Sequence, residues 1–178
     1  MSNSPILNPN DGDCFYQLQS KISYGRSPDK IEAFIEYDTL ENINLNSPII
    51  ENNKFKYIKG TKWFDFLPFN NSFDFAVSKN VKDTLEENNI TGLSFFPILI
   101  ENHEDKHYFC FAVTSIAGKI LNLEKLNNYE DDYTEFDINT WDGSDIFNLN
   151  ETGVFVCTKR VKDILTKKKF TNVELKIL

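Results

Sequence analysis

Two segments of this chain align without a gap, and this internal repeat limits the possible folds more than any other feature. They are FAVSKNVKDTLEENNITGLSFFPI (Phe75 to Ile98) and FVCTKRVKDILTKKKFTNVELKIL (Phe155 to Leu178). Each copy has the pattern of a short strand, a hydroxyl residue, a helix, a turn and a second strand. Two copies are too few to stack into a solenoid, which needs several repeats to bury its faces. The sequence therefore predicts two related strand–helix–turn–strand units within one domain.

The residues at the ends of the two helices match between the copies. Ser78 and Thr158 stand at the N-cap positions, where a side-chain oxygen accepts a hydrogen bond from a backbone N–H of the first turn. Gly92 in the first copy matches Asn172 in the second, and these residue types best tolerate a positive φ, so we expect the same turn. The apolar stripes that would face a sheet are Val81 and Leu85 in one helix and Val161, Ile164 and Leu165 in the other.

The remaining segments fit around these units in a single domain. We expect residues 1–13, rich in Asn, Pro, Gly and Asp, to form a flexible lead-in to one α+β domain over residues 14–178. The segments His107–Ile116 and Lys119–Leu123 predict a hairpin around Ala117-Gly118 on a largely antiparallel sheet. No low-complexity linker divides the chain.

Periodicity leaves two further segments open. Cys14–Tyr24 and Ile31–Tyr37 each fit a strand or a helix. Asn42–Asn53 is polar and contains Pro48, which predicts a loop, and Phe55–Ile58 then predicts a short strand.

The composition indicates a globular protein of the cytoplasm. A chain of 178 residues with 40% hydrophobic residues, sixteen of them Phe, can build one substantial core. No apolar run reaches the roughly 20 residues of a membrane span, and the first residues lack the features of a signal peptide. Cys14, Cys110 and Cys157 are odd in number and widely spaced, which favours reduced thiols over a disulfide framework or a zinc site.

The net charge of −8 is unevenly distributed along the chain. Residues 101–158 hold twelve acidic side chains against three Lys, whereas residues 159–178 hold seven Lys or Arg against two acids. A long acidic stretch argues against nucleic acid as a partner, because phosphate binding depends on Lys and Arg. It suits a basic protein partner, and it equally suits a protein that stays soluble through its net charge.

The segment His103-Glu104-Asp105-Lys106-His107 matches the zinc-peptidase pattern HExxH. That pattern works on a helix, which places both His residues on one face. Here strand-like segments flank it on both sides, so the sequence predicts a loop or hairpin tip and no metal site.

The segment Asp11-Gly12-Asp13-Cys14-Phe15-Tyr16 resembles the nucleophile segment of ovarian-tumour-type cysteine proteases. In that family the Cys starts a helix and a His followed by an aromatic residue comes later, a role that His107-Tyr108 could fill. The resemblance implies a catalytic pair of Cys14 and His107, but no long apolar helical stripe follows Cys14. We keep this pair as the alternative hypothesis.

The order of elements around the repeats resembles a family of bacterial immunity proteins, which accompany polymorphic toxins and often nuclease toxins of the HNH type. The resemblance rests on these motifs: Gly60-x-Lys62-Trp63-x-Asp65, Val77-Ser78, Thr91-Gly92-Leu93 with Phe95-Phe96-Pro97, and Asp145-Ile146-Phe147. It runs from about Phe55 to the C-terminus. It implies a protein without catalytic residues or cofactor that binds a cognate toxin domain, and it leaves the oligomeric state open.

The sequence offers one candidate surface for such a partner and one set of scaffold residues. The candidate surface is Tyr129, Glu130, Asp131, Asp132, Tyr133, Thr134 and Glu135, which either contacts a basic toxin or is a solvated acidic loop. Trp63 and Trp141, which precede the two copies, are expected in the core, and Asp65 and Asp145 are expected to cap or hydrogen-bond nearby backbone.

Overall fold

The computed structural model describes residues 15–21, 34–37, 55–69, 74–122, 135–149 and 153–178, and confirms the predicted α+β class. The helices are α1 (Lys79–Glu87) and α3 (Lys159–Lys168), with a 3-10 turn η2 (Ile138–Thr140). The strands are β1 (Phe15–Ser20), β2 (Phe34–Tyr37), β3 (Phe55–Lys59), β4 (Phe66–Pro68), β5 (Phe75–Ser78), β6 (Leu93–Ile98), β7 (Tyr108–Val113), β8 (Ile116–Ala117), β9 (Lys119–Ile120), β10 (Phe136–Asp137), β11 (Ile146–Leu149), β12 (Phe155–Thr158) and β13 (Val173–Ile177).

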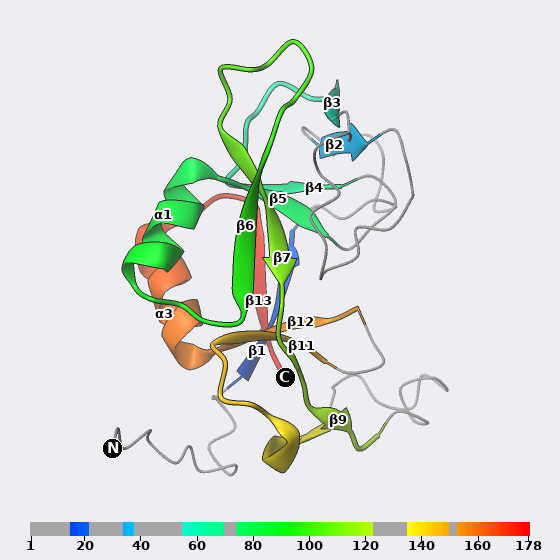
Figure 1. Cartoon of the computed structure of the whole chain (residues 1–178), viewed down its shortest axis with the longest axis vertical. Helices are drawn as coiled ribbons and strands as arrows, with labels where there is room; N and C mark the ends of the chain where they lie inside the picture. Colours follow the sequence, from blue (N-terminus) through cyan, green and yellow to red (C-terminus); the bar gives the residue numbers. More distant parts are fainter. Residues whose placement is uncertain (1–14, 22–33, 38–54, 70–73, 123–134, 150–152) are drawn as a thin grey trace.

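The strands form two main sheets. Their orders are β4-β5-β7-β6 and β13-β1-β12-β11-β8, and β2-β3 and β10-β9 are separate pairs. The pairings are antiparallel except that of β8 with β11, which is parallel. Figure 1 shows α1 and α3 side by side on one flank of these sheets.

The two sheets contain matching sets of elements. We define unit one as β4, β5, α1, β6 and β7, and unit two as β11, β12, α3, β13 and β1. In unit one β7 lies between β5 and β6, and in unit two β1 lies between β12 and β13. The registers agree as well: Tyr108 pairs with Ser78 at the end of β5, and Phe15 pairs with Thr158 at the end of β12. The central strand of unit two therefore comes from the opposite end of the chain.

The two helices begin after the predicted N-cap residues, and most of the predicted stripe is buried. Ser78 is the N-cap of α1, and its hydroxyl accepts a hydrogen bond from the backbone N–H of Val81 at 3.4 Å. Thr158 is the N-cap of α3, although its side chain makes no cap hydrogen bond. The residues that face the sheets are Val81 and Leu85 in α1 and Val161 and Leu165 in α3, whereas Ile164 is half-buried.

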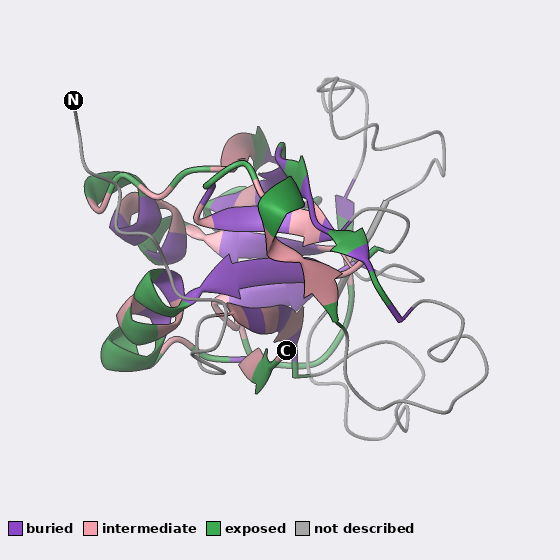
Figure 2. Cartoon of the chain, turned by 90° about the horizontal axis from the view of Figure 1, so that it is seen from below, coloured by how far each residue is buried: buried purple, intermediate pink, exposed green. Residues whose placement is uncertain are grey.

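The main core lies between the two sheets and the helices. Phe66, Phe75, Phe111 and Phe155 meet there, with ring centroids 5.0 Å apart for Phe75 and Phe111 and 5.8 Å for Phe75 and Phe155. Figure 2 shows the buried strands at the centre and the exposed faces of the helices outside. Because rings from both units interlock, neither sheet can be removed without exposing the core of the other.

Two smaller aromatic clusters flank this core. Trp63 packs against the cluster of Phe55, Phe69 and Tyr108, and Trp141 packs against a separate cluster that contains Phe147. Both Trp side chains are half-buried. The two Trp side chains lie at the edge of the core, whereas the sequence predicted that they lie inside the core.

The structure assigns the two open segments to strands and corrects a further prediction. The two segments with ambiguous periodicity contribute β1 and β2. The predicted hairpin around Ala117-Gly118 is wrong: β8 pairs with β11 and β9 with β10, because Gly118, at φ +82°, redirects the chain between two different partners. The lead-in and the loop Asn42–Asn53 lie outside the described residues. Neither α1 nor α3 has the length and apolar character that crossing a membrane requires.

Candidate interaction site

Asp65 joins the two units at one end of the helix pair. Its Oδ2 accepts hydrogen bonds from the backbone N–H and the hydroxyl of Thr171, both at 2.8 Å, and its Oδ1 accepts one from Ser78 Oγ at 2.8 Å. Thr171 lies in the turn between α3 and β13, so the acidic residue directly before β4 of unit one binds the turn that leads into β13 of unit two. The backbone N–H of Asp65 donates in return to Thr171 Oγ1 at 2.8 Å.

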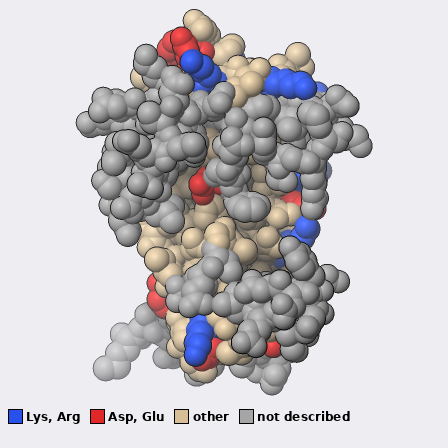
Figure 3. All heavy atoms as spheres, turned by 90° about the vertical axis from the view of Figure 1, so that its right-hand side faces the viewer, with Lys and Arg blue, Asp and Glu red and all other residues tan. Residues whose placement is uncertain are grey.

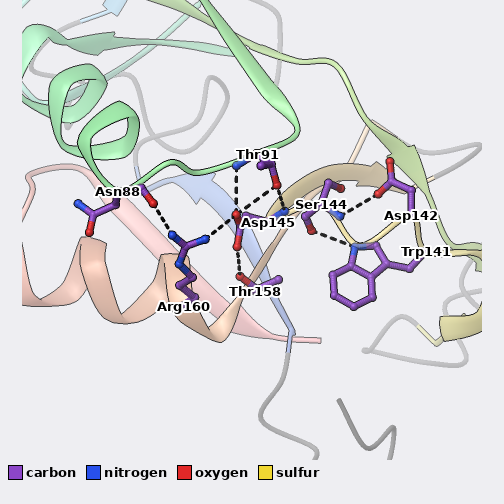
Figure 4. Close-up of polar contacts among 8 residues, drawn as sticks. All are labelled: Asn88, Thr91, Trp141, Asp142, Ser144, Asp145, Thr158 and Arg160. Carbon is purple, nitrogen blue, oxygen red and sulfur yellow. Dashed lines mark hydrogen bonds and ion pairs between the residues drawn. The ribbon is translucent and has the colours of Figure 1, made fainter. Parts of the chain in front are cut away.

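Asp145 makes the equivalent contact at the other end. Its Oδ2 accepts from the backbone N–H and the hydroxyl of Thr91 at 3.1 and 3.2 Å, and its Oδ1 accepts from Thr158 Oγ1 at 3.4 Å. The backbone N–H of Asp145 donates to Thr91 Oγ1 at 3.0 Å. Figure 4 shows Asp145 between these partners, with Arg160 closing the arrangement from α3. We call these two contacts the Asp65 latch and the Asp145 latch.

Arg160 distinguishes the two latches. Its Nη1 lies 2.9 Å from Asp145 Oδ2, and its Nη2 donates to the backbone oxygen of Asn88 at the end of α1. Unit one has no equivalent, because Asn80 follows Lys79 where Arg160 follows Lys159. The Asp145 latch therefore carries an ion pair, and among the described residues the Asp65 latch does not.

Gly92 allows a close approach between the units. It has φ +87°, and a Cβ atom there would lie 1.8 Å from the backbone oxygen of Ile146. Asn172, at the matching turn, has φ +60° and uses its side chain to donate to Phe66 O at 2.7 Å. The prediction that both turns adopt positive φ is confirmed.

The structure brings most of the predicted scaffold residues together. Asp65 with Ser78 and Asp145 with Thr158 belong to the two latches, and Gly92 follows Thr91 at the second. Trp141 lies beside the Asp145 latch, where its Nε1 donates to Ser144 O at 2.9 Å. The sequence reasoning missed Thr91 and Thr171 as latch partners, although their identity in both copies was the signal that could have found them.

A polar cavity of about 400 Å³ opens next to the Asp145 latch. It is lined by Thr91, Gly92, Thr114, Ser115, Asp142, Gly143 and Ser144. Ser115 Oγ donates to Asp142 Oδ2, Ser144 N donates to Asp142 Oδ1 at 3.0 Å, and Ser144 Oγ donates to Ser115 Oγ at 2.9 Å. Burial acts to raise the pKa of Asp142, but the hydrogen bonds from Ser115 and Ser144 outweigh it and hold that pKa below its usual value.

Exposed apolar side chains lie on the segment that follows Ser115. Ile116 is 62% exposed and Leu121 is 61% exposed. The backbone N–H of Leu121 donates to Glu135 O at 2.9 Å, which places this segment beside the end of the predicted acidic surface. Of that predicted surface, Glu135 is exposed, and Tyr129, Glu130, Asp131, Asp132 and Tyr133 lie outside the described residues.

The face shown in Figure 3 carries charges of both signs. On the side shown in Figure 3, acidic and basic atoms both occur near the upper and the lower end.

The HExxH-like segment lies in the turn between β6 and β7, as predicted. His103 contacts the rings of Trp63 and Tyr57 edge-on, at centroid distances of 4.9 and 5.5 Å. Trp63 and Tyr57 stack on each other at 4.2 Å. His103 therefore packs in an aromatic cluster, and no group of three metal-ligating side chains occurs in the part of the chain that the structure describes.

The described residues do not favour the cysteine-protease alternative. The residues after Cys14, which itself lies outside them, form strand β1 where that family begins a helix. Phe15, next to Cys14, packs in the cluster of Phe147, whereas Tyr108, next to His107, belongs to the cluster of Phe55.

The other two cysteines are buried and poorly suited to nucleophilic chemistry. Burial raises the pKa of the Cys157 thiol to about 12. Burial, with a contribution from Asp74, raises the pKa of the Cys110 thiol to about 12 as well. Both thiols are therefore neutral at physiological pH.

Comparison with known proteins leaves the family unassigned. No family model matches the sequence. No curated protein matches it either.

Proposed function

We propose that this chain is a cytoplasmic immunity protein that binds a cognate bacterial toxin domain and neutralises it by non-catalytic occlusion. We expect the toxin to be a basic protein that is secreted as an antibacterial effector. A nuclease is one candidate for its activity. The motifs of the resemblance to immunity proteins, which include Trp63-x-Asp65, Thr91-Gly92 and Asp145-Ile146, motivate the proposal.

The observation that carries the proposal is that the motif residues form hydrogen bonds within the fold, whereas apolar side chains elsewhere remain exposed. Asp65 and Asp145 use their carboxylates to hold the two units together through Thr171 and Thr91, and Ser78 supports Asp65. On the strand that pairs with β11, directly after Asp145, Ile116 is exposed. A rigid scaffold with an apolar and acidic surface is what tight occlusion of a basic domain needs.

Co-expression tests the proposal directly. The toxin domain encoded by the neighbouring gene is produced from an inducible promoter in a bacterial host, with and without this chain. We expect the toxin alone to stop growth and the chain to restore it, with a complex of the two recovered by size-exclusion chromatography. Unrestored growth together with no complex would contradict the proposal.

The acidic surface has its own test. Replacing the acids and Tyr residues of positions 129–135 with Ala and Ser should weaken binding and flatten its salt dependence while the melting temperature stays unchanged. Unchanged affinity would remove this segment from the interface and leave the function standing.

A further inference from the structure

The cavity beside the Asp145 latch presents hydrogen-bond acceptors. Ionised Asp142 can only accept, so the Ser115 hydroxyl must use its proton on that carboxylate. Ser115 Oγ then receives the proton of Ser144 Oγ. The hydroxyl protons of Ser115 and Ser144 are therefore both used in hydrogen bonds within the cavity. The remaining lone pairs of Asp142, Ser115 and Ser144 suit a ligand with N–H donors.

The charge in the cavity has no counter-ion among the described residues. Asp142 makes no ion pair there, whereas Asp145 has Arg160 at 2.9 Å. The charge of Asp145 is therefore already neutralised by Arg160, whereas the charge of Asp142 is not neutralised by any described residue. The cavity has a volume of about 400 Å³ and is wide open to solvent, with Asp142 itself exposed.

The surroundings of the cavity suit a protein ligand. Ile116 directly follows Ser115 and is 62% exposed, and Leu121 lies further along the same segment. Exposed apolar groups beside a charged pocket are able to exclude water from an ion pair when a partner covers them, which strengthens that pair. A free small cation would leave these apolar groups in water.

We propose that this cavity receives a Lys or Arg side chain of the protein partner, with Asp142 as the ionic contact and Ser115 and Ser144 as supporting acceptors. The inference rests on the proposed function, since it specifies how a basic toxin domain would be recognised. Ile116 and Leu121, exposed on the segment that follows Ser115, would then be available to the same partner.

Binding of the toxin domain to four variants is the first test. Asp142→Asn keeps the shape of the side chain and removes its charge, and we expect it to raise the Kd about tenfold or more, measured by calorimetry. Glu101→Gln is the matched control, because Glu101 is exposed in the turn at the opposite end of β7. Thr114→Lys places a cation at the exposed rim of the cavity and should weaken binding likewise, whereas Thr114→Gln should not.

The second test uses the chain without its partner. Ethylguanidinium or butylammonium chloride is titrated against the isotope-labelled chain, with sodium chloride at equal ionic strength as the reference. We expect the amide signals of Ser115, Gly143 and Ser144 to shift with the organic cation in the wild type and not in Asp142→Asn. Equal shifts in both chains, or none, would overturn the assignment of the cavity.

The two tests separate the inference from the function on which it rests. Tight toxin binding that changes equally in Asp142→Asn and Glu101→Gln overturns the cavity and leaves the immunity function intact. A wild-type chain that does not bind the toxin overturns the function, and the cation titration then decides the chemistry of the cavity alone.

Discussion

Removing one latch should cost this protein a large part of its stability. Asp65→Ala deletes three hydrogen bonds of 2.8 Å, two to Thr171 and one to Ser78. Hydrogen bonds to a charged group contribute about 1.5–3 kcal/mol each, and we take about 1 kcal/mol here because the site is only partly buried. The expected loss is therefore about 3 kcal/mol, against a typical total of about 5–15 kcal/mol.

Urea denaturation followed by tryptophan fluorescence measures this loss. With a slope of about 2 kcal/mol/M, the midpoint should fall by about 1.5 M. Trp63 and Trp141 lie near different latches, so the signal covers both units. Asp163→Ala, which removes an exposed partner of Lys159 on α3, is the control and should leave the midpoint nearly unchanged.

A further result would refute the reasoning about the latch. If Asp65→Ala lowers the stability by less than about 0.5 kcal/mol, the contact between Asp65 and Thr171 does not hold the units together. The latches lie at opposite ends of α1, a helix of nine residues and thus about 13 Å long, so the effects of Asp65→Ala and Asp145→Ala should add.

Three more predictions follow from the same contacts. Gly92→Ala should abolish cooperative thermal unfolding, because its Cβ would overlap Ile146 O, whereas Gly143→Ala, with open space around it, should cost only about 1–2 kcal/mol. Cys110 and Cys157 should stay unlabelled by a thiol reagent at pH 8 until the chain unfolds, since burial keeps them protonated; mass spectrometry of native labelled protein checks this. The pKa of Asp142 is lowered on folding, so ionised Asp142 adds to the free energy of unfolding above its unfolded pKa of about 4. This stabilisation is lost as the pH falls through the folded pKa. The difference in unfolding free energy between the wild type and Asp142→Asn, measured by urea denaturation, should therefore vanish in acid.

The sequence predicted best what depends on near neighbours. The N-cap at Ser78, the buried stripe of Val81 and Leu85 and the positive φ of Gly92 all follow from residues a few positions apart, and all are confirmed. Asp65 was expected to bind nearby backbone, and its main partner is Thr171, far along the chain. Such a partner depends on how the two units pack, which no local pattern encodes.

The same limit explains the errors around the cavity. The run from His107 to Leu123 has the pattern of a hairpin, but its second half finds better partners in β11 and β10. Ser115, Asp142 and Ser144 come together only because of that exchange. They carry no motif, and the sequence therefore gave no reason to single them out.

The position of β1 also has a consequence for synthesis on the ribosome. Tyr16 and Gln17 pair with both β12 and β13, near the other end of the chain. At about 5–20 residues per second, β1 waits on the order of ten seconds before its neighbours are translated. The strands and the helix of unit one all lie between Phe66 and Val113, so unit one can fold during that time. Its folded sheet then provides a surface on which unit two can pack. A chain that is released before β12 is made would keep both edges of β1 unpaired. We therefore expect truncated products to aggregate or to be degraded more readily than the full chain.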